Sequence, residues 1–151
     1  MAKQKTLLVG LGNPLMSDDA VGLLVAREVH RRLGNPTVEL CEASVAGIEL
    51  MELLVGYDHA MVIDAIQTDG QVGELRHLNP GGRSWGELPD NAHRFGVFEG
   101  LELGRRLGLE LPEKVIVLGV EVADPYTFAE GLTPELEEKL PGVVEEVLRL
   151  L

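Results

Sequence analysis

Short apolar runs alternate along the chain with segments in which apolar residues recur every three or four positions. The apolar runs that predict strands are residues 6–10, 37–41, 59–65, 72–78 and 114–122. The segments with helical spacing begin near Val21, Gly47, Phe98 and Thr133. Each short run is bounded by turn residues, and each periodic segment is long enough for a helix, so the pattern separates the two kinds of element.

The predicted elements follow the order β-α-β-α-β-β-α-β-α. This order is typical of an α/β protein, a three-layer α/β/α sandwich with a mostly parallel sheet. The connection before residues 72–78 is short, which predicts one antiparallel strand. A chain of 151 residues has the length of one domain, so we expect a single domain over residues 1–151.

Several local signals predict where helices begin and end. Ser17 is the expected N-cap of the helix that contains Val21, and Thr133, followed by Pro134, is the expected start of the last helix. Pro141 lies inside that last helix and predicts a kink or break. Residues 79–92 form the longest stretch without a regular pattern, and loops of this length are often functional.

The charge balance argues against several classes of partner. Lysine and arginine number 13 and aspartate and glutamate 25, so the net charge is −12 and the isoelectric point is near 4.7. Nucleic acids and anionic membrane surfaces are bound mainly through lysine and arginine, so we expect neither as a partner. The segment from Met1 to Lys5 leads directly into a short strand, and the expected location is the cytoplasm. The lone Cys41 excludes an internal disulfide and is expected to be a small core residue.

Polar residues with metal-binding chemistry fall where the predicted parallel strands end. Ligands of open α/β sheets bind at that edge. The residues placed there are Asp18, Asp19, Glu42, Asp64, Glu121 and His93, the last in the loop before the third helix. Carboxylates with one imidazole suit zinc, nickel or another first-row divalent ion.

These candidates carry different weight. Asp64 stands inside the apolar run MVIDAI, where a carboxylate is costly unless it is paired or bound to metal. Asp19 is equally consistent with a charge at a helix start, and Glu42 and Glu121 with solvated strand ends. Asp18 and Asp19 point about 100° apart around a helix, so they are not expected to form a facing pair. Asp18 and Glu42 are second-rank candidates for a general base.

Known catalytic and nucleotide-binding patterns are missing from the sequence. It contains no HExxH, no GxSxG and no P-loop, and the segment GLGN at residues 10–13 lacks the full GxGxxG. We therefore expect no nucleotide cofactor.

Three ordered segments resemble the maturation endopeptidases of nickel–iron hydrogenases. They are GLGNPLMSDDAVG, AGIELMELLVGYDHAMVIDAI and NAHRFGVFEGLELGRRLG, and the late GLTPEL matches a further element of that family. The resemblance implies a cytoplasmic enzyme that removes a short C-terminal extension from the hydrogenase large-subunit precursor after nickel insertion. It also implies that Asp19, Asp64 and His93 contact the metal, most simply nickel carried by the precursor.

One segment departs from the family pattern. Many members carry Asp-Gly-Gly-Thr before the second helix, whereas this chain has EASVAG at residues 42–47. The acid is kept as Glu42 and the glycines are not. Because this loop is expected to touch the precursor, partner choice is expected to differ from that of the better-known members.

Other functions are compatible with parts of the sequence. VGLGNP is similar to the opening of peptidyl-tRNA hydrolases, but residues 15–19 differ from that family's continuation and the acidic chain is unsuited to tRNA. A non-enzymatic metal-binding assembly chaperone on the same fold and an unrelated metal-dependent hydrolase are further alternatives.

Overall fold

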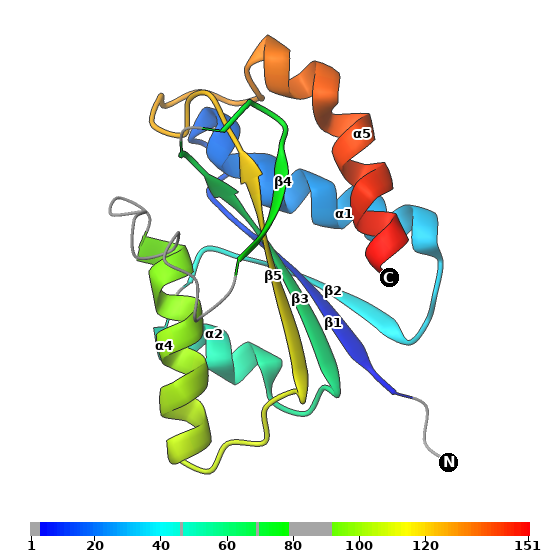
Figure 1. Cartoon of the computed structure of the whole chain (residues 1–151), viewed down its shortest axis with the longest axis vertical. Coiled ribbons are helices and arrows are strands. Elements are labelled where there is room, and N and C mark those ends of the chain that lie inside the picture. The colour runs from blue at the N-terminus through cyan, green and yellow to red at the C-terminus, as the bar shows by residue number, and fades with distance from the viewer. Residues whose placement is uncertain (1–3, 46, 69, 79–91) are drawn as a thin grey trace.

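The computed structural model describes residues 4–45, 47–68, 70–78 and 92–151, without the side chains of residues 47 and 92–96 (Figure 1). The strands are β1 (Thr6–Leu11), β2 (Val38–Ala43), β3 (His59–Ile66), β4 (Leu75–Leu78) and β5 (Lys114–Glu121). The helices are η1 (Ser17–Ala20, a 3₁₀ turn), α1 (Val21–Leu33), α2 (Gly47–Leu54), α4 (Ala92–Arg106) and α5 (Pro134–Leu150). Most of the predicted irregular segment, residues 79–91, lies outside the described residues.

The strands form one sheet in the order β2-β1-β3-β5-β4. The pairs β1–β2, β1–β3 and β3–β5 are parallel, and β4 pairs antiparallel with β5. Helices α1 and α5 cover one face of the sheet, and α2 and α4 cover the other (Figure 1). The predicted three-layer α/β sandwich with one antiparallel strand is therefore confirmed.

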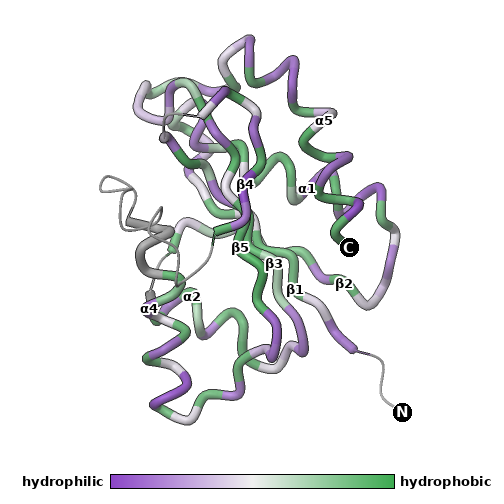
Figure 2. Tube along the Cα trace, in the orientation of Figure 1, coloured by the Kyte–Doolittle hydropathy of each residue, from purple (hydrophilic) through white to green (hydrophobic). Residues whose placement is uncertain are grey.

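Alternation along β3 divides the core between the two faces. Met61 and Ile63 pack with α1 and α5, whereas Val62 and Ile66 pack with α2 and α4. Figure 2 shows the resulting apolar character along the central strands. Since side chains of a strand alternate, Asp64 lies on the face covered by α2 and α4.

The glycine-rich turn after β1 lets α1 begin in direct contact with the sheet backbone. A Cβ added at Gly22 would lie 2.4 Å from the carbonyl oxygen of Ile63 and 2.5 Å from that of Leu11. A Cβ at Gly12, where φ is +152°, would lie 2.0 Å from the carbonyl oxygen of Asp19. Such distances leave room only for hydrogen, so the glycines set how closely η1 and α1 approach β1 and β3.

The start of α5 agrees with the sequence prediction, whereas the role of Ser17 and the break at Pro141 do not. Ser17 is not the N-cap of α1, because it begins η1 with φ of +47° and its hydroxyl donates to the carbonyl of Gly131. Thr133 is the N-cap residue of α5 as predicted. Pro141 does not break α5, which is continuous over 134–150 because its apolar face is buried against α1 and the sheet.

Within the described part of the chain, none of the helices is both long enough and apolar enough to cross a membrane.

The close approach at Gly22 predicts a large loss of stability for Gly22→Ala. The added methyl group would overlap two carbonyl oxygens, so the backbone of α1 must move away from β1 and β3. We expect the free energy of unfolding to fall by at least about 2 kcal/mol, measured by urea denaturation.

Gly142→Ala is the matched control in α5. Apart from its chain neighbours and its own helix, no described atom lies within 4 Å of the Cβ that it would add. It should raise stability by about 0.5–1 kcal/mol through helix propensity. Equal effects of the two substitutions would contradict the account of the turn.

Candidate active site at the carboxyl edge of the sheet

The direction in which successive strands are added to the sheet reverses between β1 and β3. It leaves β1 for β2 through α1 on one face and returns to β3 through α2 on the other. In open α/β sheets the carboxyl ends of two such strands border a crevice where ligands bind. Asp19 follows β1 and Asp64 lies near the carboxyl end of β3, so both belong to this region.

Asp64 is fully buried within its strand. Its Oδ1 accepts the backbone N–H of Ala65 at 2.8 Å, and its register partner on β5 is Gly119. A carboxylate at this depth carries a large desolvation cost, which a bound cation or hydrogen bonds must offset.

Asp19 is half-buried at the rim of the same region. Its Oδ2 accepts the backbone N–H of Asn13 at 2.8 Å. Its turn, η1, contacts β3, and Gly12 packs directly against the Asp19 carbonyl. The glycine-rich turn therefore folds back onto Asp19 and holds its carboxylate at the carboxyl edge of the sheet.

His93 lies in the first turn of α4, because the helix begins at Ala92 rather than near Phe98. Helix α4 runs opposite to the parallel strands, so its first turn lies toward their carboxyl ends (Figure 1). It also covers the face on which Asp64 lies. The imidazole of His93 is outside the described side chains, and its metal contact stays a prediction.

Among the side chains that the structure describes, no three of His, Cys, Asp and Glu gather as a metal site. The side chain of His93, the third member of the predicted set, is not among those described. The set Asp19, Asp64 and His93 therefore stays a prediction.

Asp18 is fully buried, and its carboxylate bonds to the chain after β5 and to the start of α5. Its Oδ2 accepts the N–H groups of Ala123 and Asp124 at 3.0 and 2.9 Å. Its Oδ1 accepts the N–H of Thr133 at 2.7 Å, and the Thr133 hydroxyl also donates to the carboxylate. Because protein donors occupy both oxygens of this buried carboxylate, it is poorly placed to contact a substrate, and the two neighbouring aspartates have separate partners.

Glu42 lies at the carboxyl end of β2, the outer strand of the sheet. It forms an ion pair with Arg27 of α1 at 2.5 Å. The side chains are partly open to solvent, so this pair is expected to contribute little to stability. Two residues further on, the hydroxyl of Ser44 donates to the carbonyl of Gly12, which connects this segment to the glycine-rich turn.

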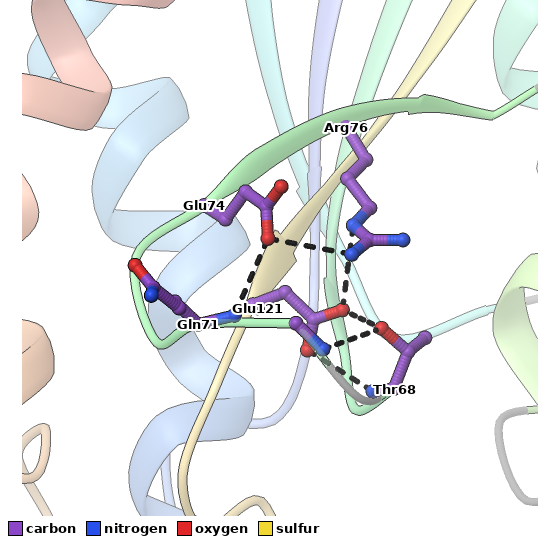
Figure 3. Close-up of polar contacts among 6 residues, drawn as sticks. Thr68, Gln71, Glu74, Arg76 and Glu121 are labelled. Carbon is purple, nitrogen blue, oxygen red and sulfur yellow. Dashed lines mark hydrogen bonds and ion pairs between the residues drawn. The ribbon is translucent and has the colours of Figure 1, made fainter.

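Glu121 is buried at the end of β5 and belongs to a polar cluster on the β3–β4 connection (Figure 3). It accepts the N–H of Thr68 at 3.0 Å and also the Thr68 hydroxyl. Nε of Arg76 lies 3.7 Å from Glu121, and Glu74 contacts the same arginine at 3.3 Å. Glu121 is thus not a solvated strand end. Through its bonds to Thr68 it holds the segment that follows β3 against the end of β5.

Cys41 has the surroundings of an unreactive thiol. Burial raises the pKa of the Cys41 thiol, and the neighbouring Glu42 carboxylate raises that pKa further. Since the thiolate is the nucleophilic form, this environment disfavours a cysteine nucleophile.

Contacts that no local sequence pattern predicts join distant segments of the chain. The pairing of Asp18 with Thr133 spans 115 positions, although Thr133 itself carries the signal of a helix start. The run DPYT at residues 124–127 carries a turn signal, and Asp124 accepts the N–H groups of Tyr126 and Thr127. These local signals predict a turn and a helix start, but not the hydrogen bonds that Asp124 and Thr133 donate to Asp18.

The fold and site define a three-layer α/β protein with carboxylates at the switch point of its sheet. Residues 23–150 match the HycI family model, which describes hydrogenase maturation proteases. The chain is 29% identical to the hydrogenase 2 maturation protease of Escherichia coli K12 over 154 residues, covering 97% of this chain and 90% of that protein.

Solved structures agree with the sequence match. The hydrogenase maturating endopeptidase HybD from E. coli aligns with a TM-score of 0.79 and 27% identity, covering 98% of this chain and 92% of that one. The NiFe hydrogenase maturation protease HybD from Thermococcus kodakarensis aligns with a TM-score of 0.66 and 25% identity, covering 97% and 99%. This chain belongs to the hydrogenase maturation protease family, and it is a protease.

The cluster around Glu121 predicts that Glu121→Gln lowers stability. The amide would present N–H groups to a pocket of donors from Thr68 and would lose the charge that faces Arg76. We expect a loss of about 1–3 kcal/mol in the free energy of unfolding, measured by urea denaturation.

Glu74→Gln is the control within the same cluster. The Glu74 side chain is 46% exposed and contacts the same Arg76, so its neutralisation should change stability by less than about 0.5 kcal/mol. A loss as large as that of Glu121→Gln would show that burial is not the cause.

Proposed function

We propose that this protease removes the C-terminal extension of a nickel–iron hydrogenase large-subunit precursor after nickel has been inserted. The observation that carries the proposal is the fully buried Asp64 carboxylate at the switch point of the sheet, beside the turn that bears Asp19. The names of the relatives support a hydrogenase as the object of maturation.

The proposed metal contacts are Asp19, Asp64 and His93, and the nickel is part of the substrate. Carboxylate oxygen and imidazole nitrogen fit a first-row divalent ion. Three protein ligands leave coordination positions for groups of the precursor. A divalent ion held in this way polarises a carbonyl group and lowers the pKa of a bound water molecule.

The protein residues have separate tasks in this proposal. Asp64 supplies a negative charge in a site shielded from water, where its attraction for a cation is strong. Asp19, at the rim, contacts the ion from the side open to the precursor. Of the two second-rank bases, Asp18 has its oxygens engaged by buried donors, and Glu42 pairs with Arg27 on the α1 face of the sheet, opposite the face of Asp64, so we assign the role of general base to neither.

We propose the cytoplasm as the place of action and a protein as the partner. The net charge of −12 is unfavourable for binding nucleic acid or an anionic membrane. The segment from Glu42 to Ser44 leads from the outer strand to the glycine-rich turn, where Ser44 contacts Gly12. We propose that the departure from Asp-Gly-Gly-Thr at this segment changes which hydrogenase group is served.

A comparison of nickel-loaded with nickel-free precursor tests whether cleavage depends on completed nickel insertion. Purified protease is incubated with nickel-loaded and with nickel-free precursor, and the precursor C-terminus is followed by mass spectrometry. We expect cleavage of the nickel-loaded precursor alone, because the nickel-free precursor would bring no ion for the three proposed ligands to bind. Equal cleavage of both forms would overturn the nickel dependence.

Substitution of the ligands tests the site. Asp64→Asn and His93→Ala should each lower kcat/KM for nickel-loaded precursor by at least about 100-fold, since loss of even an outer-shell partner costs about 10–100-fold. Asp58→Asn, at the opposite end of β3, and His77→Ala, on the exposed part of β4, are matched controls. Full activity of Asp64→Asn or His93→Ala would refute the site assignment.

A further inference from the structure

Asp18 connects three segments that are far apart in the sequence. Its carboxylate accepts hydrogen bonds from Ala123 and Asp124 after β5 and from Thr133 at the start of α5. Its own backbone N–H donates to the carbonyl of Asp124 at 3.0 Å. A fully buried charge with several charge-assisted hydrogen bonds holds its partners in one geometry.

Backbone hydrogen bonds of Leu15 and Ser17 also hold turn η1 in place. The N–H of Ser17 donates to the carbonyl of Ala129 at 2.8 Å, and the N–H of Ala129 donates to the carbonyl of Leu15 at 2.9 Å. On the other side, Gly12 packs against the carbonyl of Asp19 with no room for a Cβ. Turn η1 is therefore confined between the glycine-rich turn and the chain that follows β5.

We infer that Asp18 is a positioning residue that fixes the place of the Asp19 carboxylate at the site. Asp18 and Asp19 are adjacent in η1, so hydrogen bonds on the buried side of the turn decide where the next side chain lies. This inference rests on the proposed function only for its effect on metal binding and cleavage. The geometric part, that loss of the Asp18 contacts displaces Asp19, stands apart from it.

The alternative role for Asp18, proton transfer to substrate, differs in its consequences. A general base must reach the reacting group, whereas both oxygens of Asp18 are occupied by donors from the protein interior. Asp18→Asn keeps the size of the side chain but replaces one acceptor with an N–H donor that faces other donors. Thr133→Val removes a single donor and keeps the carboxylate, so it is the milder change.

The backbone N–H of Asn13 reports on the position of Asp19, because it donates to Oδ2 of that residue. Amide spectra recorded by NMR compare the native protein, Asp18→Asn, Thr133→Val and Thr133→Ser, with Asp19→Ala, which removes both acceptor oxygens, defining complete loss of the bond. Asp18→Asn should move the Asn13 resonance toward its position in Asp19→Ala. Thr133→Val should move it less, and Thr133→Ser, which keeps the hydroxyl, should resemble the native protein.

Val147→Ala controls for general loss of stability. Val147 is a buried residue of α5 that packs on the α1 face of the sheet, and its truncation lowers stability without touching Asp18. The Asn13 resonance should stay in place in this variant. If the resonance in Asp18→Asn and Thr133→Val matches that in Val147→Ala, the inference is overturned.

Zn²⁺ is the probe for the second readout, measured by calorimetric titration of the full chain. Asp18→Asn should weaken Zn²⁺ binding about tenfold, as outer-shell changes do, and Val147→Ala should not. In the Asp19→Asn background, Asp18→Asn should have no further effect on Zn²⁺ affinity. If Asp19→Asn leaves both Zn²⁺ affinity and precursor cleavage intact while Asp18→Asn displaces the Asn13 resonance, the positioning role holds and the proposed metal site fails.

Discussion

The close contact between the start of α1 and the backbones of β1 and β3 is the constraint on which the site depends. Gly22 lies against the carbonyl oxygens of Leu11 and Ile63, and Gly12 lies against that of Asp19. Any side chain at these positions would separate the helix from the sheet. The glycines thus bring η1 to the edge of the sheet near which Asp64 lies. Their role is steric, and the carboxylates supply the chemistry.

Burial of an acidic side chain has two different meanings in this molecule. Asp18 and Glu121 are buried with hydrogen-bond donors from other segments, and each attaches a connection to the sheet edge. Asp64 is buried within an apolar strand at the switch point, where ligands of such sheets bind. Burial alone therefore does not identify a catalytic acid. Its place at the switch point of the sheet is what makes Asp64 the candidate ligand.

The comparison with relatives shows how little identity the fold requires. At 27% identity the chain still aligns with the E. coli endopeptidase with a TM-score of 0.79. Packing on both faces of the sheet depends on apolar character and volume, which many aliphatic residues can satisfy. The glycine contacts and the buried carboxylates tolerate far less change, because each depends on one particular group at one position.

The sequence by itself determined the order of the elements, the three layers and the antiparallel strand, because hydrophobic periodicity and connection length are local properties. It also singled out Asp64 as a candidate, since a carboxylate within an apolar strand stands out in the sequence, and the structure shows that this side chain is fully buried. Only the tertiary structure decided the roles of Asp18, Glu121 and Ser17. Their partners are supplied by packing across the sheet edge: Thr133 lies 115 positions from Asp18, and Thr68 lies 53 from Glu121. It also showed that α5 continues through Pro141, because burial of a whole helix face outweighs the loss of one backbone hydrogen bond.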